Sequence, residues 1–224
     1  GAESAVSPLA MSAFASMKAL SERNDEPEKA SRPFDRDRAG FVMGEGAGIF
    51  IFEEMEHARK RGAPILAEVL GYGMSADAYH ITQPEEQGIG AIAALEASLR
   101  DARIEPDQVD YVNAHGTGTP LGDVAETAAL KTVFGDHARQ LRISSTKSAI
   151  GHLLGASGGV ELVATIMALQ NGVIPPTLNL ENPDAQCDLN YTPLVPQDAR
   201  VNIAVSNSFG FGGHNACIVV AKPK

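Results

Sequence analysis

Residues 109–134 read VDYVNAHGTGTPLGDVAETAALKTVF and change character twice along their length. The mostly apolar run at 109–112 predicts a buried strand, and the apolar pattern of 123–134 predicts a helix. Between them, the glycines and threonines of 113–120 predict a loop. A strand, a loop and a helix in this order are typical of a layered α/β protein.

The same alternation continues on both sides of this stretch. Helices are predicted over 8–20, 53–61, 88–102 and 156–170. Strands are predicted over 49–52, 65–70, 141–144, 203–205 and 216–220, the last two joined by a glycine-rich turn. The polar stretch 21–33 predicts a surface loop. The sequence therefore predicts an α/β fold.

The predicted helix 156–170 carries apolar residues all around its axis, so we expect it to be buried on most faces. Glu161 lies inside this apolar set. A buried carboxylate without a partner costs several kcal/mol. We therefore expect a cationic or hydrogen-bonding partner for Glu161.

Composition excludes several classes of function. The chain has 224 residues, 44% of them hydrophobic and 21% charged, with a formal net charge of −10. Such an acidic chain is not a general nucleic-acid binder, and it disfavours binding to anionic membranes. It has no apolar run of 18 residues for a transmembrane helix and no targeting character at its start. We expect a cytoplasmic or organellar location.

Several common site types are also absent from the sequence. Two cysteines, Cys187 and Cys217, are too few for a disulfide scaffold or a zinc site. Cys217 reads as a buried strand thiol, and Cys187 reads as structural because no basic residue is adjacent. The glycines at 44–48 lack the spacing of a dinucleotide-binding loop. The histidines lack the spacing of a zinc protease.

Three glycine-rich segments each follow a short predicted strand. They are NAHGTGTP at 113–120, SSTKSAIGH at 144–152 and SNSFGFGG at 206–213. Loops at strand ends are where α/β folds place their sites, so we expect the three to converge on one pocket. His115 and His152 lie in two of these loops, which favours a functional role for both.

Together these three segments resemble the condensing enzymes of the β-ketoacyl-acyl-carrier-protein synthase I/II type. The flanking segments 31–35 (SRPFD), 44–48 (GEGAG) and 179–184 (NLENPD) match as well. Two histidines favour the elongating type of synthase. The segment around Lys147 is more similar to the discrete fatty-acid enzyme, the synthase II, than to a polyketide module.

The resemblance implies a thiolase-like fold, a duplicated core of αβαβα layers. Residues 1–62 would be the tail of its N-terminal half and residues 63–224 its C-terminal half. In this family the nucleophilic cysteine lies in a segment upstream of residue 1, and neither Cys187 nor Cys217 matches it. We therefore expect the chain alone to lack condensing activity.

The resemblance also implies roles for individual residues. His115 and His152 would donate through neutral Nε2–H groups to the enolate formed from malonyl carrier protein. Lys147 would lie near both, paired with Glu126, and Asp123 would support the site. The backbone N–H of Phe211 would serve a second oxyanion hole, and its ring would gate the acyl tunnel. Further substrate contacts would come from Thr117, Thr119, Phe209 and Gly210, the threonines to pantetheine.

No cofactor is required by this chemistry, because phosphopantetheine arrives on the carrier protein. The resemblance does imply a structural monovalent or divalent cation. Its ligand positions would be Asn113, Glu126, Glu161, Ser206 and Asn207.

The implied partners are acyl and malonyl carrier protein, the N-terminal half and a second copy in a homodimer, with no nucleic acid and no membrane. Because carrier proteins are acidic, docking needs a local basic patch, for which the candidates are Lys18, Arg32, Arg36 and Arg38. Alternatives are a non-catalytic subunit similar to a chain-length factor, a polyketide ketosynthase subunit, or an unrelated α/β binding domain. The presence of His115, Lys147 and His152 favours the enzyme.

Overall fold

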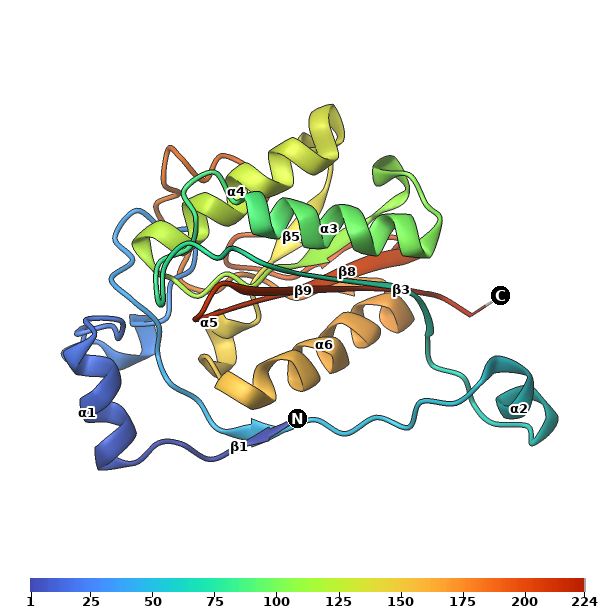
Figure 1. Cartoon of the computed structure of the whole chain (residues 1–224), viewed down its shortest axis with the longest axis horizontal. Coiled ribbons are helices and arrows are strands. Elements are labelled where there is room, and N and C mark those ends of the chain that lie inside the picture. The colour runs from blue at the N-terminus through green and yellow to red at the C-terminus, as the bar shows by residue number, and fades with distance from the viewer. Residues whose placement is uncertain (224) are drawn as a thin grey trace.

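The computed structural model describes residues 1–223, which form layers around a five-stranded mixed sheet (Figure 1). The strand order is β3 (Glu68–Ala76), β9 (His214–Ala221), β8 (Ile203–Gly210), β4 (Tyr111–Asn113) and β5 (Arg142–Ser144). Strand β4 runs parallel to β5 and to β8, whereas β9 is antiparallel to β8 and β3. The carboxyl ends of β4, β5 and β8 therefore meet at one edge of the sheet.

Helices cover both faces of this sheet (Figure 1). Helices α3 (Ile89–Ala102) and α4 (Pro120–Phe134) lie on one face, and α6 (Ser157–Asn171) packs on β8 from the other. A Cβ on Gly73 would lie 2.0 Å from the Ala94 carbonyl oxygen, so this glycine lets α3 approach β3 closely. The prediction of an α/β layer structure is confirmed.

Two apolar clusters fill the layers. Residues of α3, α4 and the adjoining sheet face form the larger cluster, which includes Leu95, Leu130 and Ile143. Tyr111, Leu162 and Leu169 belong to the smaller cluster between the sheet and α6. Burial of such side chains is the main force that holds the layers together, at about 25 cal/mol per Å² of apolar surface.

The remaining elements are short. Strand β1 (Ala2–Glu3) pairs with β2 (Gly46–Ala47), and β6 (Val173–Ile174) pairs with β7 (Gln197–Asp198). Helices α1 (Pro8–Ser16) and α2 (Met55–Lys60) lie away from the sheet, and α5 (Lys147–Ile150) follows β5 (Figure 1). The 3-10 helices are η1 (Pro27–Lys29), η2 (Pro106–Gln108), η3 (Gly135–Arg139) and η4 (Leu154–Ala156). Among residues 1–223, no helix has both the length and the apolar character to cross a membrane.

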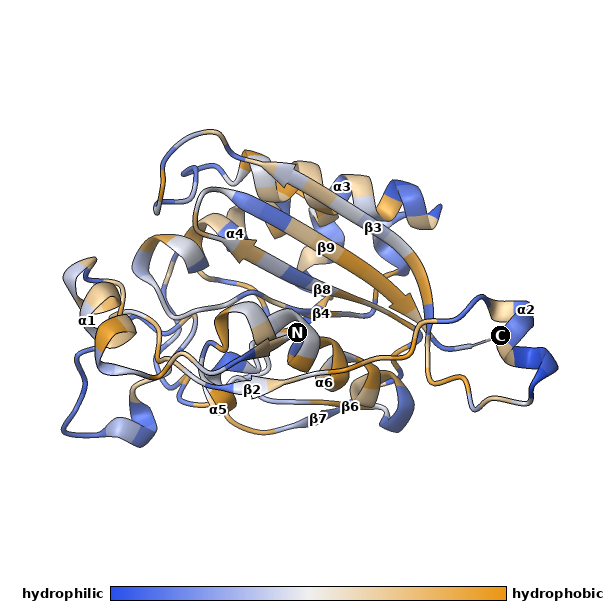
Figure 2. Ribbon diagram, turned by 60° about the horizontal axis from the view of Figure 1, so that its bottom comes forward, coloured by the Kyte–Doolittle hydropathy of each residue, from blue (hydrophilic) through white to orange (hydrophobic). Residues whose placement is uncertain are grey.

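The predicted strand at 49–52 is wrong. This segment belongs to no strand, and Ile49, Ile51 and Phe52 are 86%, 82% and 67% exposed. Figure 2 shows its hydrophobic residues on the outer path from β2 to α2. Apolar residues form a strand only where a neighbouring strand pairs with them, and no described segment does so here.

The α6 prediction needs a correction as well. Leu162, Ile166 and Leu169 are buried, but Val163 and Met167 are 41% and 54% exposed. On this side of the sheet, no described helix covers β3 and β9 (Figure 2). A groove lies open there beside α6, lined by Tyr72, Leu162 and Ile218 among others. The helix therefore buries one face rather than most of its surface.

Several predicted boundaries shift. Helix α1 ends at Ser16, not residue 20, and Lys18 adopts a positive φ of 54°. Helix α4 begins at Pro120 because proline fits the first turn, where its missing N–H is not needed. The predicted strand 65–70 extends instead over β3, and the last two strands run through 203–210 and 214–221. Most of the third predicted loop is therefore strand.

Candidate active site

The three predicted segments meet at one cavity of about 590 Å³. His115 follows β4 and His152 follows α5, and their ring centroids lie 5.4 Å apart with the rings nearly perpendicular. Both line the cavity, as do Phe209 and Phe211 from the β8–β9 hairpin. The parallel arrangement of β4, β5 and β8 produces this convergence, because the loops after them leave the same sheet edge.

Glu126 of α4 holds the backbone at His115. Its two carboxylate oxygens accept hydrogen bonds from the N–H groups of His115, at 2.9 Å, and of Gly116, at 2.8 Å. Asn207 Nδ2 donates to the same carboxylate at 3.1 Å. Burial raises the pKa of Glu126, and these three donors oppose that shift. The residue therefore positions the loop that carries the histidine.

The His152 ring is held in one protonation state by the turn after it. Its Nδ1 accepts a hydrogen bond from the Leu154 N–H at 3.1 Å. A backbone N–H can only donate, so Nδ1 carries no proton and Nε2 carries it. Burial, followed by the charge of Lys147, lowers the pKa of His152 to about 3. Its ring is therefore a neutral donor at neutral pH.

His115 is neutral for similar reasons. Burial, then the charge of Lys147 and the neighbouring His152, lower the pKa of His115 well below its usual value. Within the described chain its Nδ1 has no hydrogen-bond partner. The cavity wall therefore carries two uncharged imidazole rings next to each other.

Lys147 forms its ion pair with Glu161 of α6, and both side chains are 1% exposed. The expectation that Glu161 has a cationic partner is confirmed. The expectation that Lys147 pairs with Glu126 is wrong, since Glu126 bonds to backbone N–H groups and Asn207 instead. A buried charge needs a close partner, and α6 places Glu161 nearest the lysine.

The five residues expected to hold a cation, called the cluster below, are all buried. Asn113 Nδ2 donates to the Glu161 carbonyl oxygen at 3.0 Å, and Asn207 Nδ2 donates to Glu126. Two buried oxygens of the cluster, Glu161 Oε2 and Asn207 Oδ1, lack a partner among the described residues. Oxygen donors suit an alkali or alkaline-earth cation, so these residues fit one. No group of three or more His, Cys, Asp and Glu in residues 1–223 forms a metal site.

Thr117 and Thr119 line the cavity, and their hydroxyl oxygens lie 3.0 Å apart. The Asp123 carboxylate anchors their loop. It accepts hydrogen bonds from the Gly118 N–H at 3.1 Å and from the Phe34 N–H at 2.7 Å. Burial raises the pKa of Asp123 to about 7. The position of Asp123 agrees with a supporting role.

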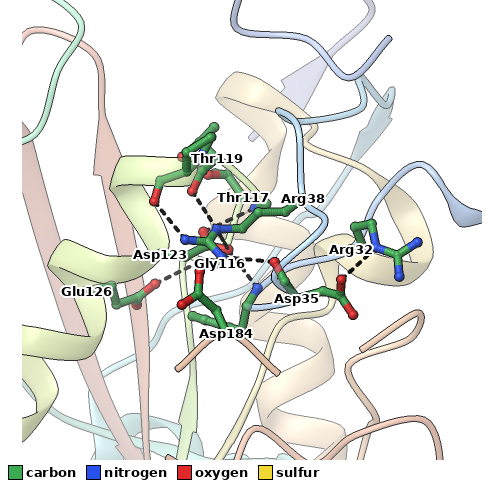
Figure 3. Close-up of polar contacts among 12 residues, drawn as sticks. Arg32, Asp35, Arg38, Gly116, Thr117, Thr119, Asp123, Glu126 and Asp184 are labelled. Carbon is green, nitrogen blue, oxygen red and sulfur yellow. Dashed lines mark hydrogen bonds and ion pairs between the residues drawn. The ribbon is translucent and has the colours of Figure 1, made fainter. Parts of the chain in front are cut away.

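The expected basic docking patch is only half present. Arg38 is buried among Asp123, Asp184 and the carbonyl oxygen of Thr119 (Figure 3). Arg32 is buried against Asp35. Both guanidinium groups are therefore structural, because a partner cannot reach them. Lys18 and Arg36 remain exposed.

The third segment is mostly strand, as noted, and only Phe211–Gly213 form the turn. Phe211 is 44% exposed and its ring centroid lies 6.3 Å from that of Phe14 on α1. Gly210 ends β8 beside Phe209, whose ring lies 5.7 Å from His115. Phe209, Gly210 and Phe211 thus all line the cavity.

Sequence reasoning missed two residues that contact His152. Phe41 packs its ring 5.1 Å from the imidazole, and Ser157 places its hydroxyl oxygen 3.0 Å from Nδ1. The only signal for Ser157 is a hydroxyl residue near the predicted start of a helix. Cys187 and Cys217 are buried and free, and burial raises the pKa of both, to about 11 for Cys187. Their reading as unreactive thiols agrees with the structure.

Residues 66–181 match the Beta-ketoacyl synthase, C-terminal domain, and residues 1–58 match the Beta-ketoacyl synthase, N-terminal domain. The chain belongs to the β-ketoacyl synthase family. Similar proteins named 3-oxoacyl-[acyl-carrier-protein] synthase 2 occur in Synechocystis sp. (55% identical) and Coxiella burnetii (52% identical). Each alignment covers 99% of this chain, but 53% and 54% of the relative. The chain thus spans about half the length of these relatives.

The fold of this chain is also similar to solved structures of β-ketoacyl synthases. A type II polyketide ketosynthase solved in complex with its acyl carrier protein matches with a TM-score of 0.97 at 37% identity. The match covers all of this chain and 55% of that one. A β-ketoacyl synthase from Burkholderia phymatum matches with a TM-score of 0.92 at 38% identity, over 100% and 54% of the two chains. The predicted thiolase-like α/β class is confirmed.

Proposed function

We propose that this chain supplies the two-histidine half of a 3-oxoacyl-[acyl-carrier-protein] synthase II. The reaction would be the decarboxylative Claisen condensation of an acyl thioester with malonyl carrier protein. The main observation behind this proposal is the pair of neutral imidazoles, His115 and His152, which line one cavity. The proton of the His152 ring is fixed on Nε2. The names of the relatives, at 52–55% identity, support this choice of reaction.

The chemistry follows from what neutral donors can do. When malonyl thioester loses CO₂, the electron pair of the broken C–C bond becomes an enolate, with negative charge on the thioester oxygen. Two preorganised N–H donors stabilise that charge, and removing such a donor typically costs 10²–10³ in rate. The enolate carbon then attacks the acyl thioester carbonyl, and the cysteine thiolate leaves. Neither histidine needs to change its charge.

Lys147 acts through its charge. Burial is the main cause that lowers the pKa of both histidines, and the charge of Lys147 lowers it further, which favours their neutral forms. Its partner Glu161 prevents the cation from being left buried and unpaired. Phe211 supports the second oxyanion hole in this proposal, because its turn forms part of the cavity wall.

The nucleophilic cysteine would come from an N-terminal half of the family. An open groove beside α6 supports this, since a second layer of the fold needs a surface to pack on. It has a volume of about 450 Å³ and is lined in part by Phe50, Phe52, Tyr72, Leu162 and Ile218. Ile49 lines the same groove as these two phenylalanines, and its side chain is exposed.

Carrier protein is the partner that this function requires. In the solved polyketide complex, a ketosynthase of this fold binds its acyl carrier protein. We extend that partnership to this chain, with pantetheine reaching the cavity past Thr117 and Thr119. The exposed Lys18 and Arg36 are the remaining basic candidates for docking, and the homodimer and the cytoplasmic location stay predictions.

The cation is a separate part of the proposal. Asn113, Glu126, Glu161, Ser206 and Asn207 would hold it, and it would supply positive charge beside the two carboxylates. A bound cation stabilises the folded chain by mass action. The melting temperature should therefore rise in KCl or MgCl₂ relative to choline chloride. Asn207→Leu should remove that rise, and an equal rise in the variant would contradict the ligand set.

The main test compares the purified chain with a completed synthase. We define the completed synthase as this chain preceded by the remaining, cysteine-bearing part of the N-terminal domain, taken from the Synechocystis relative. The completed synthase should condense acyl and malonyl carrier protein, and the chain alone should not. Condensation by the chain alone would contradict the proposal and return attention to Cys187 and Cys217.

A non-catalytic subunit similar to a chain-length factor is the second candidate. One solved match is a ketosynthase with its chain length factor, at 39% identity and a TM-score of 0.92. The buried Lys147–Glu161 pair and both histidines favour the catalytic role. If the completed synthase assembled but neither decarboxylated nor condensed malonyl carrier protein, the second candidate would replace the first.

A further inference from the structure

Ser157 is the first residue of α6 and its side chain is directed back at the catalytic turn. Its Oγ lies 3.0 Å from His152 Nδ1 and accepts a hydrogen bond from the Leu153 N–H at 2.9 Å. The residue is 4% exposed and lines the same cavity as His152. No part of the mechanism described above uses it.

The direction of the Ser157–His152 hydrogen bond follows from the neighbouring bonds. Nδ1 already accepts from the Leu154 N–H at 3.1 Å, so it has no proton to give. Ser157 Oγ is occupied as an acceptor by the Leu153 N–H, while its hydroxyl proton is free to rotate toward a lone pair. The only consistent assignment has the Ser157 O–H donating to His152 Nδ1.

We propose that Ser157 is a positioning residue for His152, whose hydroxyl holds the imidazole as the Nε2–H tautomer aimed into the cavity. The role assigned to that N–H, donation to an enolate oxygen, rests on the proposed function. The hydrogen bond itself does not. Ser157 touches no reacting atom and acts through the histidine.

Two donors on Nδ1 have a chemical consequence. They draw electron density from the ring, which makes the Nε2–H a stronger donor toward developing negative charge. The two donors also disfavour protonation of Nδ1, because a proton on Nδ1 would point at the Leu154 N–H. Lys147, the charged group whose field reaches the ring, is a cation and offers no acceptor to such a proton.

The test uses two variants of equal shape. Ser157→Thr keeps the hydroxyl, whereas Ser157→Val replaces it with a methyl group. The full chain is labelled with ¹⁵N-histidine, and the His152 signals are identified by their absence from His152→Gln. At neutral pH, the Nδ1 signal in Ser157→Thr should stay at the position of the parent protein. In Ser157→Val it should move toward the position of a ring nitrogen with one donor fewer.

Both variants could disturb the turn itself, because Ser157 also caps the Leu153 N–H. The Leu153 amide signal and thermal unfolding report that separately. A merely structural role would alter those two readouts in Ser157→Val and leave the Nδ1 signal in place. That result, or an identical Nδ1 signal in all three proteins, would overturn the proposal.

The completed synthase provides the functional readout. Ser157→Val should lower the turnover of malonyl carrier protein decarboxylation about twofold to tenfold, the effect of one net hydrogen bond, with KM unchanged. Ser157→Thr should recover most of that loss. Turnover equal to the parent in Ser157→Val would overturn the catalytic consequence. If the completed synthase were inactive altogether, the proposed function would fail while the NMR result still decided the hydrogen bond.

Discussion

Two neighbouring segments of the N-terminal region differ sharply in burial. Residues 30–35 read ASRPFD, contain two charged side chains and are buried throughout, whereas 49–52 read IFIF and are mostly exposed. The first segment is anchored by specific partners: Asp35 binds Arg32 and the N–H groups of Glu181 and Asn182, and Phe34 stacks on Tyr191. The second pairs with no strand among residues 1–223. Partners, rather than hydropathy, decide burial in this region.

This difference bears on function because the buried segment supports the site. The Phe34 N–H donates to Asp123, and Arg38 contacts Asp123 and the Thr119 carbonyl oxygen. The segment thus holds the loop that carries His115. The exposed segment lies beside the open groove, and under the proposed function it would contribute a surface for assembly.

The largest expected effect comes from breaking the buried anchor. Asp35→Ala should destabilise the chain by about 3–5 kcal/mol, because the buried Arg32 would lose its partner and three backbone N–H groups, those of Asp37, Glu181 and Asn182, would lose their acceptor. Although burial alone would raise it, the Arg32 hydrogen bond and backbone donors hold the pKa of Asp35 below its usual value. Urea unfolding measures the loss.

The matched control for that variant is two residues away. Asp37 is exposed and its ion pair with Arg36, at 3.7 Å, is open to solvent. Such pairs contribute about 0–1 kcal/mol, so Asp37→Ala should be nearly silent. Equal losses in the two variants would mean that the buried network does not anchor the segment.

A second prediction concerns pH. His152 has a folded pKa of about 3, below the usual 6.5, so between these values the unfolded chain binds the proton and the folded chain does not. Stability from this group is therefore present above pH 6.5 and is lost as the pH falls toward 3. At pH 5 the loss should be about 2 kcal/mol.

Asp123 changes the stability in the opposite direction with pH. Its folded pKa of about 7 lies above the usual 3.8, so its contribution to stability is present below pH 3.8 and is lost as the pH rises through 7. His152→Asn should therefore remove much of the acid-side loss and leave the Asp123 contribution in place. A stability–pH curve for His152→Asn that matches the parent would contradict the neutral, buried state of this ring.

The smallest expected effect belongs to the exposed segment. Ile49→Ser should change the stability of the chain by less than about 0.5 kcal/mol, because the side chain is 86% exposed. The same variant should weaken the binding of this chain to the cysteine-bearing part of the N-terminal domain when the two are expressed separately, as measured by gel filtration. A large loss of stability in the chain itself would show that 49–52 is packed in solution.

The same contrast explains which features the sequence predicts. Periodic segments such as 88–102 and 156–170 yield helices near their predicted positions, because local pattern and tertiary packing agree there. The convergence of His115 and His152 follows from loops after neighbouring strands. The partner of Lys147 does not, because Glu161 lies on a separate helix and only packing decides that it, rather than Glu126, reaches the lysine.

The burial of two arginines could not be predicted from the local sequence either. Arg32 and Arg38 look like surface cations in the sequence, but their acceptors, Asp35, Asp123 and Asp184, come partly from distant segments. The contact between Ser157 and His152 could not be predicted for the same reason. It depends on how the turn after His152 folds back onto the start of α6.

Decarboxylation of malonyl carrier protein by the completed synthase tests the central claim most directly. His115→Ala and His152→Ala should each lower the rate by about 10²–10³, because each removes one neutral donor from the enolate oxygen. Asparagine or glutamine at either position should recover part of the activity, since an amide N–H still donates but takes up no proton. Decarboxylation at the parent rate in both alanine variants would contradict the account and leave the histidines with a structural role only.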